Sequence, residues 1–173
     1  MKQLTYYVAS SIDGYIADKN GDVDWLDLVD MEKDDHGFND FYDSTDALIM
    51  GRTSYQQILD FGDWPYPGKP CWVMSSQHMP SDYDNVTITS QTPAELLASI
   101  RQQGYNNTWL VGGGKLAKAF HDAGLIDEYV ISLIPYILGE GVPLLANGAS
   151  PGELKLVDCV RHDSGVVQLR YRH

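Results

Sequence analysis

One short segment of the chain reads Leu110-Val111-Gly112-Gly113-Gly114-Lys115-Leu116. It follows a short apolar run and precedes a segment with helical periodicity, so three glycines stand where a strand passes into a helix. Glycines let the backbone approach a ligand closely, and the amide groups and dipole at a helix start favour an anion such as a pyrophosphate. Alone, the stretch is equally consistent with a tight turn, because it has neither the Rossmann nor the Walker spacing.

Two further strand ends carry groups that can bind an anion. One reads Ile49-Met50-Gly51-Arg52-Thr53-Ser54-Tyr55 and the other reads Val73-Met74-Ser75-Ser76-Gln77. The arginine offers a forked set of donors suited to phosphate, and the hydroxyl groups can cap a helix or bind the same anion. A capped helix with a surface arginine and an ordinary turn are the simpler interpretations of each motif alone. Read together, the three strand ends predict one elongated ligand that carries phosphate groups.

Strands and helices alternate along the first two thirds of the chain. We expect strands at residues 4–9, 47–50, 71–74, 86–89 and 108–111, and helices at residues 37–44, 53–61, 93–103 and 116–124. This alternation predicts a mainly parallel sheet with helices on its faces. Residues 128–135, 154–160 and 166–171 have strand character without intervening helices, so they should add antiparallel strands at one edge.

Length and charge limit the kinds of function that the protein can have. The chain has 173 residues, a formal net charge of −12 and no repeat or linker, which predicts a single domain over residues 1–173. The scattered Lys and Arg residues form no basic patch, so neither nucleic acid nor an anionic membrane is an expected partner. The N-terminal apolar run is too short for a signal peptide or a membrane span, which makes the cytoplasm the expected location.

Cysteine and histidine positions give no pattern of metal ligands. Cys71 and Cys159 lie far apart, without the short Cys or His spacing of a zinc site. We therefore expect no metal and two reduced cysteines in the core. His36 and His121 have no partner nearby in the sequence and are expected at the surface.

Taken together, the motifs resemble the NADPH-binding motifs of dihydrofolate reductases, in the same order and at roughly the same spacing. Ser10-Ser11-Ile12-Asp13-Gly14 resembles the opening motif of the reductase domain of bacterial bifunctional riboflavin-biosynthesis proteins, and Gly139-Glu140-Gly141-Val142-Pro143-Leu144 resembles a late loop of that family. The resemblance covers essentially the whole chain. It implies a three-layer α/β fold of the dihydrofolate-reductase-like type, with a mainly parallel central sheet and antiparallel C-terminal strands. Relatives of this kind often form homodimers.

The same resemblance implies NADPH as the cofactor and gives each motif a role. Arg52 and Ser76 would bind the 2′-phosphate of the adenosine. The pyrophosphate would lie between two helix starts, held by Thr53, Ser54, Gly113, Gly114 and Lys115. Gly112-Gly113 would also match a cis peptide. The cofactor site would be completed by Gly51, Met74, Ser75, Val111, Gly112 and Leu116.

Candidates for the catalytic acid and the substrate contacts come from two loops. Trp25 resembles the tryptophan of the dihydrofolate reductase substrate loop, which places Asp30 where that family keeps its carboxylate. Asp13 ends the first strand at the implied cleft. Either carboxylate could instead be a solvated or turn-forming residue. Trp25 and Tyr15 could stack on a flat substrate ring or fill the core.

The riboflavin branch fits this chain imperfectly. Val111 stands where those reductases commonly carry Glu, and the acidic residues 20–27 should repel a phosphate. The expected function is NADPH-dependent reduction of a small heterocyclic substrate, closest to that of 5-amino-6-(5-phosphoribosylamino)uracil reductase. The alternatives are a dihydrofolate or pterin reductase, a non-catalytic NADPH-binding regulatory protein and a plain interaction domain.

Overall fold

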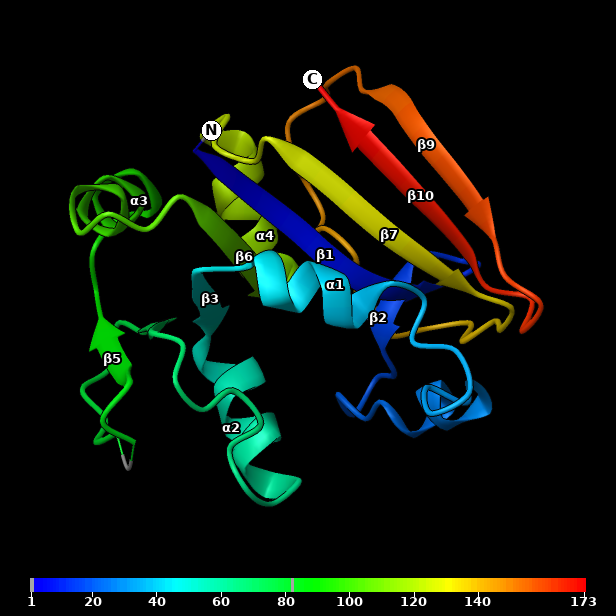
Figure 1. The fold of residues 1–173 in the computed structure, drawn as a ribbon, viewed down its shortest axis with the longest axis horizontal. Helices are drawn as coiled ribbons and strands as arrows, with labels where there is room; N and C mark the ends of the chain where they lie inside the picture. Colours follow the sequence, from blue (N-terminus) through cyan, green and yellow to red (C-terminus); the bar gives the residue numbers. More distant parts are fainter. Residues whose placement is uncertain (1, 82) are drawn as a thin grey trace.

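The computed structural model describes residues 2–81 and 83–173, and an eight-stranded sheet forms its centre (Figure 1). The strand order is β5-β4-β3-β6-β1-β7-β10-β9. The strands are β1 Gln3–Ser11, β3 Ala47–Gly51, β4 Cys71–Met74, β5 Val86–Thr89, β6 Asn107–Gly112, β7 Glu128–Ile134, β9 Lys155–Arg161 and β10 Val167–Arg172. Pairing is parallel from β5 to β7, whereas β10 is antiparallel to both β7 and β9. The expected mainly parallel sheet with antiparallel late strands is confirmed.

Helices connect the parallel strands close to the predicted positions. They are α1 Phe38–Ser44, α2 Arg52–Asp60, α3 Pro93–Gln102 and α4 Gly114–Asp122. The start of α3 is fixed by a capping box in which the Thr92 side chain accepts from the Glu95 amide and the Glu95 carboxylate accepts from the Thr92 amide. Three short elements were not predicted: the 3-10 helix η1 Asp24–Leu28 and the antiparallel strands β2 Tyr15–Ala17 and β8 Val142–Pro143.

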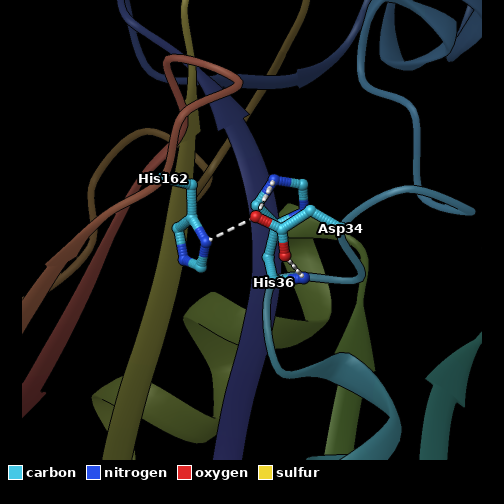
Figure 2. Close-up of side chains that lie close together, drawn as sticks. All are labelled: Asp34, His36 and His162. Carbon is cyan, nitrogen blue, oxygen red and sulfur yellow. Dashed lines mark hydrogen bonds and ion pairs between the residues drawn. The ribbon is translucent and has the colours of Figure 1, made fainter.

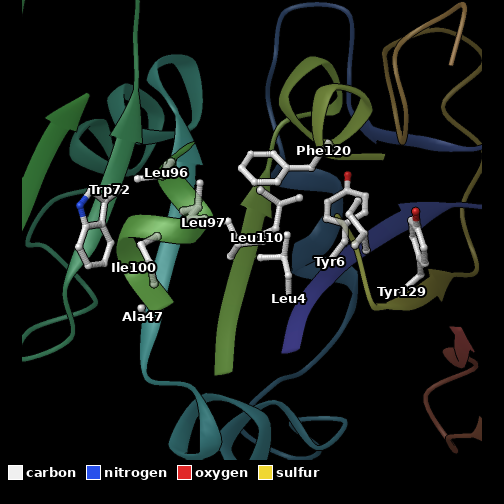
Figure 3. Packing of buried hydrophobic residues seen from close by; sticks show 13 residues of the cluster. Leu4, Tyr6, Ala47, Trp72, Leu96, Leu97, Ile100, Leu110, Phe120 and Tyr129 are labelled. Carbon is white, nitrogen blue, oxygen red and sulfur yellow. The ribbon is translucent and has the colours of Figure 1, made fainter. Parts of the chain in front are cut away.

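Two helical layers cover the sheet because successive strand residues face opposite sides. In β3, Ala47 and Ile49 belong to a buried cluster with α3 and α4, whereas Leu48 and Met50 belong to a second cluster with α2. Figure 3 shows the first cluster, in which side chains from α3 and α4 lie over the strands; its labelled helical members are Leu96, Leu97, Ile100 and Phe120. The expected three-layer arrangement is confirmed.

Three expectations about exposure need correction. Cys71 is buried, and its burial raises the pKa of the thiol to about 12, but Cys159 is exposed. The reason is that β9 is an edge strand whose residues are all exposed. His36 is buried, and His121 is half-buried with hydrogen bonds to the Tyr129 hydroxyl and the Ser150 carbonyl. Their side-chain partners lie on other elements of the fold, so the local sequence does not reveal them.

Among the helices formed by the described residues, none combines the length and the apolar character needed to cross a membrane.

Candidate active site

The ends of β4, β3 and β6 lie side by side at one edge of the sheet. Gly51 of β3 is in register with Met74 of β4, and Met50 of β3 is in register with Gly112 of β6. Parallel strands end at the same edge, so motifs that are far apart in the sequence form one group of loops. The structure therefore brings the three predicted anion-binding motifs together.

Two helices begin in this group of loops, and neither has a side-chain cap. Gly51 is the N-cap residue of α2 and Gly113 is the N-cap residue of α4. Because glycine supplies no side-chain oxygen, the first amide groups of both helices keep the capacity to bind an external acceptor. A Cβ atom on Gly51 would lie 3.7 Å from the carbonyl oxygen of Gly112, so the two helix starts are close neighbours. Their dipoles favour the same anion.

Close packing explains the glycines at the start of α4. A Cβ atom on Gly114 would overlap the backbone carbonyl oxygen of Pro143. Gly112 has a φ of 124°, a backbone conformation that favours glycine. The peptide bond between Gly112 and Gly113 is cis, as the resemblance implies. The glycine stretch is thus required by the fold as well as suited to a ligand.

Cations and hydroxyl groups surround the two helix starts. A Cβ atom on Gly113 would lie 3.7 Å from the Ser54 hydroxyl, which places that hydroxyl between the loops. The Arg52 guanidinium donates to the Gln77 side-chain oxygen and so links the second motif to the third. Neither Arg52 nor Lys115 forms an ion pair with any other residue in 2–81 or 83–173. Both charges are therefore available to a phosphate group.

A cleft of about 1150 Å³ runs from these loops across the sheet. The predicted cofactor-site residues that line it are Gly51, Thr53, Ser54, Met74, Val111, Gly113, Gly114, Lys115 and Leu116. Arg52, Ser76 and Gly112 are not among the lining residues. Ser75 is not among them either; its hydroxyl forms hydrogen bonds with the Gln77 backbone. We call the part of the cleft beside these loops the loop end.

The opposite part, which we call the far end, is built from side chains on several elements. Gln168 of β10 organises it, because its amide nitrogen lies 3.0 Å from the Tyr7 hydroxyl, 3.3 Å from the Ser132 hydroxyl and 3.0 Å from the His36 carbonyl. Tyr7, Ser132 and His36 all line the cleft. Burial raises the pKa of Tyr7, which keeps the phenol protonated. The sequence analysis did not predict this group. The only local sign of the group is that its members are polar residues inside apolar strands.

His36 closes the far end in an unusual backbone conformation. Its side chain is 4% exposed and its φ is 55°, a value that residues other than glycine rarely adopt. Its Nε2 atom lies 2.8 Å from the Ser164 hydroxyl, and its backbone amide donates to Asp34 at 2.9 Å. Burial lowers the pKa of His36 below its usual 6.5, against the opposing effect of the Asp34 charge. The imidazole is therefore neutral at neutral pH.

The two carboxylates predicted as acids lie outside the cleft lining. Asp13 accepts hydrogen bonds from the Ser11 hydroxyl and from two backbone amides of the loop after β7, and these bonds lower its pKa. Asp30 accepts from the amides of the turn that follows it. Both carboxylates thus stabilise loops. The carboxylates that do line the cleft are Asp22, Asp35 and Asp60.

The predicted aromatic contacts also lie beside the cleft. Trp25 is 8% exposed and stacks on Tyr136, with 6.1 Å between the ring centroids. Tyr15 belongs to β2 and pairs with Pro143 of β8. Neither ring is among the lining residues, whereas their neighbours Leu26 and Ile16 are.

The sheet order, the three layers and the glycine loop at the end of β6 together define a protein of the dihydrofolate-reductase-like fold. More particularly, the chain belongs to the RibD C-terminal domain family, whose model matches residues 2–168.

Full-length relatives and solved structures agree with this assignment. The uncharacterized protein YwjB of Bacillus subtilis (strain 168) is 32% identical over 171 residues, which cover 98% of this chain and 97% of YwjB. YyaP of the same organism is 31% identical over 181 residues, covering 98% of this chain and 94% of YyaP. A protein of Shewanella sp. PV-4 named for riboflavin biosynthesis has a TM-score of 0.88 at 32% identity, over 99% of this chain and 98% of its own.

A more distant structure shows the fold alone. It is the diaminohydroxyphosphoribosylaminopyrimidine deaminase/5-amino-6-(5-phosphoribosylamino)uracil reductase of Thermotoga maritima. The TM-score is 0.75 at 16% identity, and the match covers 99% of this chain and 56% of that protein.

Proposed function

We propose that this chain is an NADPH-dependent reductase of a small heterocyclic substrate, with 5-amino-6-(5-phosphoribosylamino)uracil reductase as the closest named activity. One observation carries the proposal: two helix starts without side-chain caps adjoin each other at the ends of β3 and β6, beside a large cleft. The RibD C-terminal domain family supports the reductase class.

The residues of the loop end fit a dinucleotide phosphate. The helix starts at Gly51 and Gly113 would hold the pyrophosphate through backbone amides, and Lys115 would supply a positive charge. Arg52, with Ser76 nearby in the third motif, would bind the 2′-phosphate that distinguishes NADPH from NADH. A bound NADPH would supply the hydride for a reduction, and the residues of the far end would hold the acceptor.

The far end can orient a neutral heterocycle by hydrogen bonds. The Gln168 amide group has two hydrogens, and the His36 carbonyl accepts one of them, so the other goes to the Tyr7 or the Ser132 hydroxyl. A hydroxyl that accepts this bond can direct its own hydrogen toward the substrate. A ring carbonyl or ring nitrogen would accept it. The apolar lining beside these hydroxyls, which includes Ile134 and Val166, would exclude water from the reacting carbon.

Charge argues against a phosphate on the substrate. Among the lining residues in the described part of the chain, Lys115 alone carries a permanent positive charge, and it lies at the loop end. Asp22 and Asp35 are anionic and line the same cleft. We therefore expect the substrate to be a ribosylaminopyrimidine or a related heterocycle without a phosphate group.

Two measurements test the proposal. Titration with NADPH, followed by nicotinamide fluorescence, should give saturable binding, and no binding at high micromolar NADPH would refute the cofactor assignment. Oxidation of NADPH should then be followed with a panel of ribosylaminopyrimidines, each with and without its phosphate, and of dihydropterins. Faster turnover of a dephosphorylated compound supports the proposed substrate class, whereas preference for the phosphorylated form contradicts it. Preference for a pterin would favour the folate alternative.

A second candidate is a regulatory protein that binds NADPH without turning it over. The observation that favours it is the position of Asp13 and Asp30 outside the cleft lining. Saturable NADPH binding without oxidation by any compound of the panel would select this candidate.

We also propose that two copies associate through β9. This edge strand exposes Leu156, Val157 and Val160, whose exposed fractions are 55%, 49% and 39%. Unpaired edge strands with apolar side chains favour pairing with another strand. Sedimentation velocity should show a dimer that dissociates on Leu156→Asp; a wild-type monomer at all concentrations would contradict it.

A further inference from the structure

Three potential metal ligands meet where the segment before α1 approaches the β9–β10 turn. Asp34, His36 and His162 each place one ligand atom so that all three atoms lie within 4.8 Å of one another. Figure 2 shows the Asp34 carboxylate between the two imidazole rings. The ring centroids of His36 and His162 are 4.5 Å apart. Two histidines and a carboxylate are a donor set that divalent transition metals bind.

Two of the three ligand separations lie near the value for a tetrahedral ion. Asp34 Oδ2 lies 3.0 Å from His162 Nδ1 and 3.8 Å from His36 Nε2. With metal–ligand bonds of about 2.0–2.1 Å, ligand atoms around a tetrahedral Zn²⁺ are about 3.3–3.4 Å apart. The two distances lie on either side of this value, so small side-chain rotations would bring the ligands to it.

A metal ion would replace an existing hydrogen bond in this cluster. His162 Nδ1 lies 3.0 Å from Asp34 Oδ2, and a ligating nitrogen carries no hydrogen, so metal binding would release a proton. The chain's net charge of −12 favours a cation.

Backbone geometry supports the site independently. His36 adopts a φ of 55° while almost fully buried, a strained arrangement that is typically kept where a side chain must be aimed at one position. Its Nε2 atom faces both Asp34 and the Ser164 hydroxyl, which lies 2.8 Å away. That hydroxyl could complete the coordination or yield its place to water.

We propose that Asp34, His36 and His162 form a binding site for a divalent transition-metal ion, with Zn²⁺ as the best match. Asp34 is 41% exposed and His162 is 14% exposed at their side chains, so an ion can enter from solvent. His36 also lines the far end of the cleft. The ion would join the two segments that bound this end. The proposal does not depend on NADPH or on catalysis.

The test uses the full chain without an affinity tag, after treatment with EDTA and removal of the chelator. Calorimetric titration with Zn²⁺ should give one-to-one binding, and Co²⁺ should give the visible absorption of a tetrahedral site. Asp34→Asn and His162→Leu should each weaken binding on the order of 100-fold. The matched control is His78→Leu, which removes an exposed histidine and should leave the affinity unchanged.

Three results would overturn the metal site. They are no binding at millimolar metal, undiminished affinity in both site variants, or equal losses in the His78→Leu control. Urea unfolding of each metal-free variant would show whether it folds. NADPH titration of the same samples separates the two proposals, because loss of the metal site should leave cofactor binding at the loop end intact.

Discussion

The two ends of the cleft are built in different ways. The loop end consists of backbone amides and glycines at junctions where a strand passes directly into a helix, so its groups are neighbours in the sequence. The far end consists of side chains from β1, β7 and the segment before α1, held together by Gln168 of β10. The loop end therefore depends on strand order and glycine conformation. The far end depends on register and on contacts between distant parts of the chain. A substitution at one end should therefore leave the other end unaffected.

The largest effect is expected at Gly114. In Gly114→Ala the new methyl group overlaps the Pro143 carbonyl oxygen, a backbone atom that cannot move aside easily. We expect a loss of about 3 kcal/mol in the free energy of unfolding, together with weaker NADPH binding. Urea denaturation measures the first and fluorescence titration the second. Gly152→Ala, whose Cβ would make an ordinary contact 3.7 Å from the His121 ring, is the control and should unfold like the wild type.

Arg52→Ala should weaken cofactor binding at the loop end without changing the fold. The side chain is exposed, and in the proposed complex its removal would lose charge-assisted hydrogen bonds to the 2′-phosphate, which are worth about 1.5–3 kcal/mol. NADPH affinity should fall on the order of 10- to 100-fold, whereas NADH affinity should stay the same. Arg161→Ala on β9 serves as the control. Equal losses for both cofactors would contradict the assigned phosphate contact.

His36→Asn should act on the far end alone, at a cost of about 1 kcal/mol at neutral pH. Asparagine tolerates the positive φ of this position. Burial lowers the pKa of His36 in the folded state below 6.5, the pKa of histidine in the unfolded chain. The contribution of His36 to the free energy of unfolding is therefore complete above pH 6.5 and is lost as the pH falls from 6.5 through the folded pKa. Urea unfolding with a chelator present, from about pH 8 to about pH 5, should show a flatter pH dependence in the variant. Unchanged slopes would exclude this role, and NADPH affinity should not change.

The smallest effect is expected at Asp30. Asparagine can still accept from the following backbone amides, so Asp30→Asn should change stability by less than about 0.5 kcal/mol. Turnover should also stay constant, because the carboxylate lies outside the cleft lining. A catalytic acid at this position would instead produce a fall on the order of 100-fold or more. Steady-state kinetics with the best compound of the panel decides between these outcomes.

The fold and the loop end could be predicted from the sequence because their signals are local. Apolar runs, helical spacing and glycines at strand ends lie within a few residues of one another, and the parallel sheet then brings Gly51, Met74 and Gly112 together. The resemblance added the cis peptide between Gly112 and Gly113, which the structure contains.

The far end could not be predicted because its partners are joined only by the folded sheet. Ser132 comes beside Tyr7 through the register of β1 and β7, and His36 meets Ser164 across 128 residues of sequence. The exposure of residues on an edge strand is equally hard to predict from the sequence. Cys159 stands in an apolar strand pattern that predicts burial, yet β9 has no neighbour on its outer side among the described strands.

The position of β1 bears on how the protein is made. This strand leaves the ribosome before its partners β6 and β7, so Gln3 can pair with Asn107, and Thr5 with Glu128, only after those strands have been synthesised. Until β6 and β7 have been synthesised, Leu4 and Tyr6 have no strand with which to pair. Contacts of such long range slow folding and leave apolar segments uncovered. During synthesis, this central strand of the finished sheet therefore stays unpaired until residues 107–134 have emerged.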